Sequence, residues 1–339
     1  MKKRLFASLL TAAMLVGTLT ACGSEPAPAA SSDPDAQSGA APAENTPSAE
    51  GKVKIGFSLK TVNNPFVVSV KNGAAKAAEE FGAEIIITDA QLDSQKQMTD
   101  VESFMQQKVD AILIDALDST ALLPTVQDAN DQGFKILTED SRITGAEDIV
   151  LSHVGIDNEK SGERIAQYLV DEMKKQGKKN IIIFEGLPGA EATTQRAKGF
   201  HTVLDNNSDV NILFAKNVGD KREEGLQNMD DMLQKFDNID AVICCNDELA
   251  LGAISSIEGA GREGILVTGF DGNSDGLQAV KDGRMLATID HAPYTMGYIA
   301  VETCIKAAKG ESVDKATVFD VELVDSSNVD EIIAKHANE

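Results

Sequence analysis

Polar side chains that form directed hydrogen bonds recur along this chain wherever an apolar run ends. The clearest case is residues 241–252, where a continuous apolar run, 241–245, gives way to Asn246 and Asp247 and then to a helix-periodic stretch. In open α/β sheets, ligand contacts gather where a strand hands over to a helix. We expect Asp247 to cap the helix. Asn246 would then face outward with an amide that both donates and accepts hydrogen bonds.

The same arrangement is repeated at most of the predicted strand ends. The residues concerned are Asn64, Asp89, Asp115, Asp140, Asn246, Asp271, Asp290 and His291, with Arg196 at a predicted helix start. Carboxylates accept hydrogen bonds from adjacent hydroxyls, Asn does both, and Arg donates as a fork. Phe66 offers an apolar face to the C–H side of a ring. Any one of these residues alone fits a helix cap or a solvated loop, but together they indicate a site for a polyhydroxylated ligand.

The elements that position these residues alternate regularly between strand and helix patterns. Strands are predicted at 53–59, 84–88, 111–114, 135–138, 149–154, 180–185, 210–215, 241–245, 266–269, 285–289 and 317–323, followed by a polar tail. Alternation of this kind implies an α/β fold with parallel sheets covered by helices on both faces. Two runs of similar length, before and after about Ile156, imply two lobes of one architecture whose strand ends face each other across a cleft.

The N-terminus predicts export and anchoring. Residues 1–21 combine a basic start with a short apolar run, which is typical of a signal peptide and too short for a mature membrane span. The Leu-Thr-Ala-Cys sequence that ends at Cys22 resembles the bacterial lipobox. That resemblance implies cleavage before Cys22 and a diacylglycerol on its sulfur, which gives stable anchoring at the cell surface or in the periplasm. An ordinary secreted protein with an incidental cysteine is the alternative. Residues 22–51 are rich in Ala, Pro and Ser and predict a disordered tether.

Charge and cysteine usage exclude several classes of partner. The formal net charge is −23, and without the three basic residues of 1–21 it becomes −26, so we expect no nucleic-acid partner and membrane contact only through the anchor. Cys244, Cys245 and Cys304 lie in apolar or helical patterns without metal-binding spacing. We therefore expect no metal and no cofactor.

Three separated motifs carry a family resemblance. They are Asn-Asn-Pro-Phe at 63–66, Asn-Asp-Glu-Leu-Ala-Leu-Gly at 246–252 and Gly-Phe-Asp-Gly at 269–272. In order and spacing the chain resembles, over about 53–324, the ribose/galactose-type (type I) periplasmic substrate-binding proteins of ABC importers. The resemblance implies two Rossmann-like lobes, 53–156 plus 292–320 and 157–291 plus 321–335, joined by three crossovers near Ile156, Ala292 and Asp320. It also implies a monomer that closes by hinge bending around a sugar and delivers it to a permease.

The resemblance also assigns site residues. The first lobe would supply Asn64, Phe66 and Asp140, the second lobe Arg196, Asn246 and Asp271, and the crossover His291. Family members that bind ribose have Asn at the position of Asp115, Arg at that of Ser141 and an aromatic near Asp220. These departures argue against ribose. If Asp115 and Asp220 line the cleft, they suit a ligand with an amine or with more hydroxyls.

Other functions were weighed against solute capture. An enzyme needs a nucleophile with a base, yet no histidine has such a neighbour and Gly-x-Ser-x-Gly is absent, so we expect no catalytic residues. A lac-repressor-type regulator needs an N-terminal DNA-binding motif, where this chain has a predicted signal peptide. A receptor that delivers its ligand to a sensor kinase or chemoreceptor stays open, because such a receptor would use the same closed lobes.

Overall fold

A computed structural model describes residues 51–337 and shows two parallel sheets. The first has the order β11-β5-β4-β3-β1-β2, with every neighbouring pair parallel. Its strands are β1 (Lys54–Leu59), β2 (Glu84–Asp89), β3 (Ala111–Ile114), β4 (Lys135–Glu139), β5 (Ser152–Ile156) and β11 (Ala316–Phe319). The predicted α/β class with parallel sheets is confirmed.

The second sheet has the order β7-β6-β8-β9 and is also parallel. Its strands are β6 (Asn180–Phe184), β7 (Asn211–Lys216), β8 (Ala241–Cys244) and β9 (Leu266–Thr268). Beside it, β10 (Thr288–Asp290) pairs antiparallel with β12 (Glu322–Val324). Single bridges, Thr268 to Ala287 and Asp271 to Asp290, connect this ribbon to the end of the second sheet.

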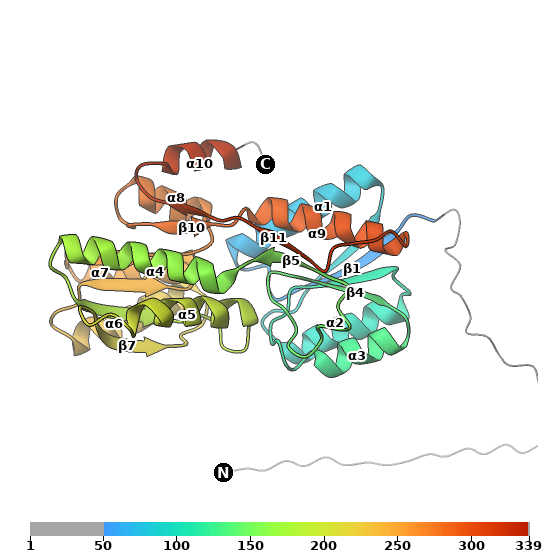
Figure 1. The fold of residues 1–339 in the computed structure, drawn as a ribbon, viewed down its shortest axis with the longest axis horizontal. Helices are drawn as coiled ribbons and strands as arrows, with labels where there is room; N and C mark the ends of the chain where they lie inside the picture. The colour runs from blue at the N-terminus through green and yellow to red at the C-terminus, as the bar shows by residue number, and fades with distance from the viewer. Residues whose placement is uncertain (1–50, 338–339) are drawn as a thin grey trace, which may run out of the picture. The chain divides into compact units, whose positions relative to one another are not determined.

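Helices cover both faces of each sheet (Figure 1). On the first sheet, α1 (Pro65–Phe81) and α9 (Pro293–Ala308) lie on one face, and α2 (Ser94–Gln106) and α3 (Leu123–Asp131) on the other. On the second, α4 (Asn158–Lys175) and α5 (Glu191–Leu204) lie opposite α6 (Arg222–Lys235) and α7 (Asp247–Gly259). Two shorter helices, α8 (Ser274–Lys281) and α10 (Val329–His336), pack together beyond α7.

The strands are apolar on both sides because both of their faces are covered. In β3, Ala111 and Leu113 join the core beneath α1 and α9, whereas Ile112 and Ile114 join the core beneath α2 and α3. Successive side chains of a strand point to opposite faces, so a continuous apolar run is what such a strand requires. The run at 241–245 follows the same rule in the second sheet.

Two glycines allow α1 and α9 to approach closely. A Cβ atom at Gly73 would overlap the carbonyl oxygen of Tyr294, and one at Gly297 would overlap the carbonyl oxygen of Val70. The two helices therefore pack backbone against backbone.

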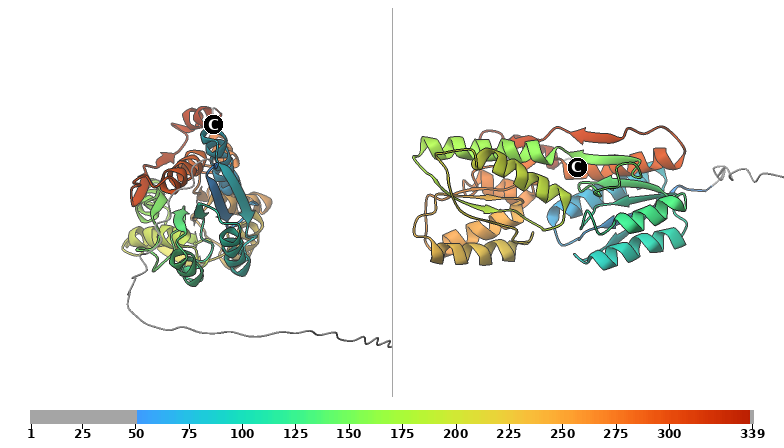
Figure 2. Two further views of the ribbon diagram at one scale, coloured as in Figure 1. Left: turned by 90° about the vertical axis from the view of Figure 1, so that its right-hand side faces the viewer. Right: turned by 60° about the horizontal axis from the view of Figure 1, so that its bottom comes forward.

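The chain passes between the two sheets three times (Figure 2): after Ile156, around Ala292, and between β11 and β12. Ala292 has a φ of 49°, a left-handed conformation that turns the chain from β10 into α9. In the described part of the chain, no helix combines the length and the apolar character needed to cross a bilayer. The predicted signal peptide, lipidated Cys22 and most of the tether lie outside the described residues.

The C-terminal prediction was wrong. The single strand predicted at 317–323 is two strands, β11 and β12, and they belong to different sheets. Asp320 stands at the break, where the family resemblance implies a crossover, but the apolar residues on both sides of it continue the strand pattern. The predicted polar tail contains α10, whose Val329 and Ile332 are buried. Their i, i+3 spacing is helical, but two apolar residues among charged ones gave too weak a signal.

Candidate functional site

The predicted strand-end residues meet in an inner pocket of about 30 Å³. Its walls are Lys60, Asn64, Phe66 and Asp140 from the first sheet and its helices, and Leu187, Ala190, Thr193, Arg196, Asp220, Asn246 and Asp271 from the second. A space of this size holds about one water molecule. We call each sheet with its helices one half of the fold. Because both halves supply walls of the pocket, any occupant contacts both.

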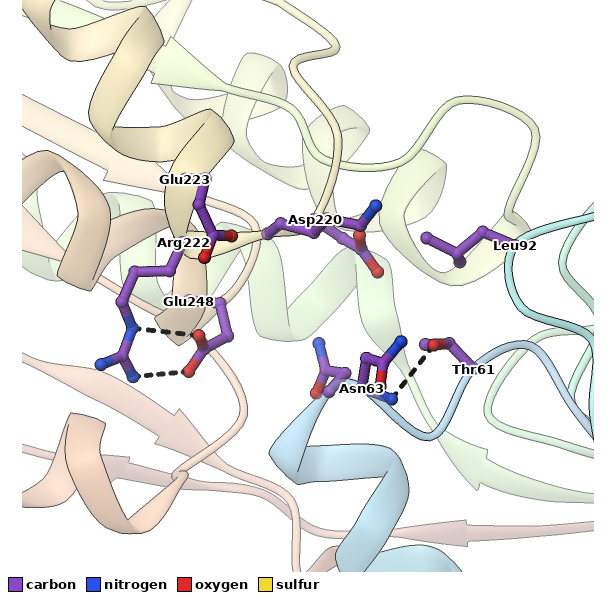
Figure 3. A pocket seen from close by; sticks show the side chains of 9 residues that line it. Thr61, Asn63, Leu92, Asp220, Arg222, Glu223 and Glu248 are labelled. Atoms are coloured by element: carbon purple, nitrogen blue, oxygen red, sulfur yellow. Dashed lines mark hydrogen bonds and ion pairs between the residues drawn. The ribbon is translucent and has the colours of Figure 1, made fainter.

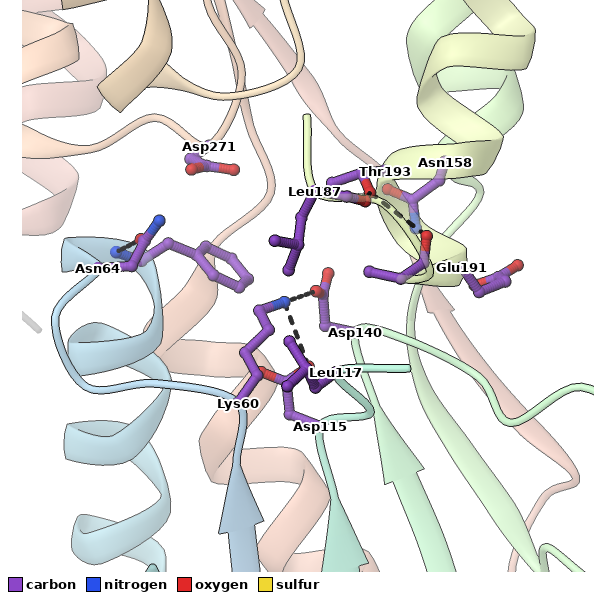
Figure 4. Close-up of polar contacts among 12 residues, drawn as sticks. Lys60, Asn64, Asp115, Leu117, Asp140, Asn158, Leu187, Glu191, Thr193 and Asp271 are labelled. Carbon is purple, nitrogen blue, oxygen red and sulfur yellow. Dashed lines mark hydrogen bonds and ion pairs between the residues drawn. The ribbon is translucent and has the colours of Figure 1, made fainter. Parts of the chain in front are cut away.

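Asn64 and Phe66 enter the pocket from the start of α1. The Asn64 Oδ1 accepts a hydrogen bond from the Phe66 N–H at 2.9 Å, so it caps the helix. Its Nδ2 group has no partner among residues 51–337, and Figure 4 shows Asn64 beside the pocket. The Phe66 ring stacks on the imidazole of His291, with centroids 4.4 Å apart and planes 7° from parallel.

The predicted helix cap was wrong: Asn246, and not Asp247, caps α7, although Asn246 also lines the pocket as predicted. Asn246 is the cap of α7: its Oδ1 accepts from the Leu249 N–H at 2.8 Å, and its Nδ2 donates to the Asp220 carbonyl at 3.0 Å. Asp247 already lies in the helix and is fully buried, where it accepts hydrogen bonds from the Asn273 N–H and the Thr288 hydroxyl. Extended backbone at Asn246 lets its side chain reach the third helical N–H, so the capping position is one residue earlier than predicted.

Lys60 is a pocket residue that the sequence prediction missed. It follows β1 directly, and its ammonium lies 2.8 Å from Asp140 and 3.2 Å from Asp115 (Figure 4). Burial alone would lower the pKa of Lys60, but Asp115 and Asp140 raise it far above its usual value. Its position at a strand end was a usable signal, but lysine is rarely buried, so its residue type argued against a place in the pocket.

The charges around Lys60 fix the protonation of its neighbours. Burial raises the pKa of Asp115 to about 7 despite the nearby ammonium. Burial would also raise the pKa of Asp140, but Lys60 and Arg196 hold it below the ordinary carboxyl range. Glu139, fully buried beside them, has its pKa raised strongly by burial and by the two aspartates. The group therefore contains one strongly ionised carboxylate, Asp140.

Arg196 connects the two halves. Its guanidinium lies 3.3 Å from Asp271 and 3.4 Å from Asp140, which belong to the second and the first half respectively. It also donates to Asn158 Oδ1 at 2.7 Å and stacks 4.0 Å from the ring centroid of Phe270. Arg196 was predicted at a helix start but is the sixth residue of α5, because the helix begins at Glu191.

Asp140 and Asp271 both have positive φ, 52° and 122°. Non-glycine residues rarely adopt such values, which cost about 1–3 kcal/mol and are concentrated at functional sites. The fold therefore holds two pocket carboxylates in conformations that an isolated chain would avoid.

Two predicted ligand-binding residues lie behind the pocket wall. Asp115 is 1% exposed and pairs with Lys60. His291 is fully buried between Phe66 and Phe270, and its Nε2 lies 3.3 Å from Asp271. Each contacts a residue of the pocket wall but is not part of the wall itself. A strand-end position predicts that a residue lies at the edge of the sheet, but it does not predict how deeply the side chain is buried.

Asp89 and Asp290 also lie outside the pocket. Asp89 accepts a hydrogen bond from the Gln91 N–H, and Asp290 accepts from the Ala292 N–H and pairs with His336. Both stabilise local turns. Within residues 51–337 no three His, Cys, Asp or Glu side chains are grouped so as to hold a metal ion.

A larger outer cavity of about 500 Å³ adjoins the inner pocket (Figure 3). It is lined by Thr61, Asn63, Asn64, Leu92, Asp220, Lys221, Arg222, Glu223 and Glu248. Asn64 and Asp220 line both spaces, so the two spaces lie next to each other at these residues.

The chain resembles known proteins in sequence and in fold. A family model described as "Periplasmic binding protein domain" matches residues 55–312. The ribose import binding protein RbsB of Bacillus subtilis (strain 168) is 38% identical over 316 residues, covering 92% of this chain and 96% of that protein. RbsB of Escherichia coli (strain K12) is 34% identical, covering 81% and 92%. A solved ABC transporter solute binding protein from Bacillus halodurans C-125, with bound myo-inositol, has a TM-score of 0.80 at 29% identity, covering 85% of this chain and all of that one.

Proposed function

The chain belongs to the periplasmic binding protein family, and on that premise we propose that it captures a monosaccharide or related polyhydroxylated solute and delivers it to an ABC importer. Like its named relatives, it acts as a binding protein and not as an enzyme. The observation that carries the proposal is the inner pocket, whose polar groups come from both halves of the fold.

We assign the contacts to the solute by the chemistry of each group. Asp271 and Asp140 accept hydrogen bonds from hydroxyls, and Arg196 donates to them. Asn64 and Asn246 each use their amide oxygen as a helix cap, so the Nδ2 group of Asn64 is the one left to donate. Phe66 packs against the C–H face of the sugar ring.

The two halves act as lobes that open and close. The inner pocket of about 30 Å³ is too small for a sugar, so the lobes separate before a solute enters. We assign 53–156 plus 292–320 to one lobe and 157–291 plus 321–335 to the other, with the three crossovers as the hinge. The contact of Arg196 with Asp140 crosses between the lobes and stabilises closure without ligand.

Cys22 supports a lipid anchor that keeps the protein outside the cytoplasm, close to its permease. We propose that the protein works as a monomer, because the site is complete within one chain. Ribose is a poor candidate, since Lys60 and Asp220 add charged groups to a pocket for a small neutral pentose.

A ligand panel tests the function. Thermal-shift screening with pentoses, hexoses, polyols and amino sugars, followed by isothermal titration calorimetry, should identify a solute with a Kd near micromolar, about 8 kcal/mol of binding free energy. Asp271→Asn should weaken binding at least about tenfold, because it removes charged hydrogen bonds. Asp209→Asn, the same change at an exposed site in the same lobe, should leave the Kd unaltered. Binding of none of these solutes would contradict the proposal.

A further inference from the structure

Asp220 is largely buried, and its carboxylate lines both spaces without a direct partner. The residue is 7% exposed, and no hydrogen bond or ion pair reaches its carboxylate oxygens from within residues 51–337. Its backbone is held on both sides: the N–H donates to Glu224 at 2.9 Å, and the carbonyl accepts from Asn246 at 3.0 Å. Because unpaired carboxylates are costly to bury, the side chain is placed to receive a partner that the protein does not supply.

The other two carboxylates that line the inner pocket, Asp140 and Asp271, already have cationic partners. Lys60 pairs with Asp115 and Asp140, and Arg196 pairs with Asp140 and Asp271. These two cations are the positively charged side chains that line the inner pocket. Each is directed at carboxylates other than Asp220.

The outer cavity does not supply a counter-ion either. Arg222 lies in a fork with Glu248, at 2.9 and 3.0 Å (Figure 3), and it also reaches Asp275 at 2.8 Å. Lys221 is exposed to solvent and makes no ion pair within the described chain. Asp220 therefore has no direct ion-pair partner where the inner pocket meets the outer cavity: Lys60 and Lys221 act on its carboxylate only from a distance, and burial raises its pKa.

We propose that the solute carries an ammonium group, which binds Asp220 at this junction while its hydroxyls occupy the inner pocket. The solute class is then an amino sugar or an aminated cyclitol. This inference rests on the proposed function and makes it more specific. A hydroxyl would donate one hydrogen bond to Asp220 but leave its charge uncompensated, whereas an ammonium group supplies both.

The position of Asp220 also sets where the amine lies on the ligand. Asp220 lines both spaces, so an amine bound to it lies on the side of the ligand that faces the outer cavity. That cavity, about 500 Å³, leaves room for a group attached on this side of the ring.

Calorimetric titration at pH 6.5, where the amine of an amino sugar is largely protonated, tests the inference with matched pairs: D-glucosamine against D-glucose, D-galactosamine against D-galactose, and D-mannosamine against D-mannose. In at least one pair the amino sugar should bind about tenfold tighter or more than its neutral parent. Asp220→Asn should remove this preference by weakening the amino sugar about tenfold, with the neutral parent changed less than about twofold. Glu263→Gln removes one exposed carboxylate from the same half of the fold and should leave the preference intact.

The outcomes separate the inference from the function it refines. If neutral sugars bind and no amino sugar exceeds its parent, the amine is refuted and solute capture stands. If Asp220→Asn weakens both members of a pair equally, Asp220 binds a hydroxyl and the inference is again overturned. If neither class binds, both fail. The comparison within the unaltered protein does not depend on the folding of the variant.

Discussion

Replacing Lys60 by Met should destabilise the ligand-free protein strongly. The change removes the ammonium group that lies between Asp115 and Asp140. Both aspartates are 1% exposed, and their carboxylates lose the counter-ion that they share. Breaking a buried ion pair by removing one partner costs about 3–5 kcal/mol. Asp140 keeps Arg196 as a second partner, so we expect a loss toward the lower end, about 3 kcal/mol at pH 8.

The loss should depend on pH in a defined direction. Burial raises the pKa of Asp115 to about 7, so this carboxyl is largely ionised at pH 8 and largely protonated at pH 6. A protonated Asp115 needs no counter-ion. Lys60→Met should therefore destabilise the protein less at pH 6 than at pH 8, and adding Asp115→Asn should recover at least about 1 kcal/mol at pH 8.

Urea denaturation followed by circular dichroism measures these free energies of unfolding, and an unchanged m-value confirms that the variants unfold as the parent does. Lys54→Met is the matched control: its pair with Glu84 is 3.7 Å long and only partly buried, so its loss should stay below about 1 kcal/mol. If Lys60→Met costs no more than this control, or costs the same at both pH values, the buried ion-pair cluster does not exist in solution.

Three further predictions concern other parts of the chain. Gly73→Ala should destabilise the protein by about 1–3 kcal/mol, because the added Cβ meets the backbone of α9. Gly259→Ala, with open space around the added Cβ, should not destabilise it. Equal melting temperatures of the two variants would refute the close packing of α1 and α9. Burial lowers the pKa of His153 to about 3, so the stability that the neutral imidazole contributes is complete above pH 6.5 and is lost as the pH falls. The loss should reach about 2 kcal/mol by pH 5, measured as the difference in unfolding free energy between the parent and His153→Asn. A difference that does not change with pH would show that the imidazole is not buried. Cys22→Ser should move the protein from the membrane fraction to the soluble fraction on cell fractionation, and its retention would contradict the lipid anchor.

Strand-end positions were a good guide to the pocket. Asn64, Asp140, Asn246 and Asp271 were identified because each follows an apolar run, and the parallel sheets bring these ends together. The rule follows from topology alone, since parallel strands place all their carboxyl ends at one edge.

Depth and ion pairing were not predictable in the same way. Asp115 and His291 satisfy the strand-end rule, yet they lie one layer behind the wall because neighbouring side chains fill the edge first. Lys60 satisfies the rule too, but its burial depends on two carboxylates contributed by other strands. Such contacts between distant segments leave no local pattern in the sequence.

A crystal structure of the protein with the tightest solute from the ligand panel tests the central claim most directly. We expect the solute between the two halves, with Asp271 and Arg196 from one and Asn64 from the other within hydrogen-bonding distance of its hydroxyls, and Phe66 against its ring. A solute bound by one half alone, or bound away from these residues, would contradict the account.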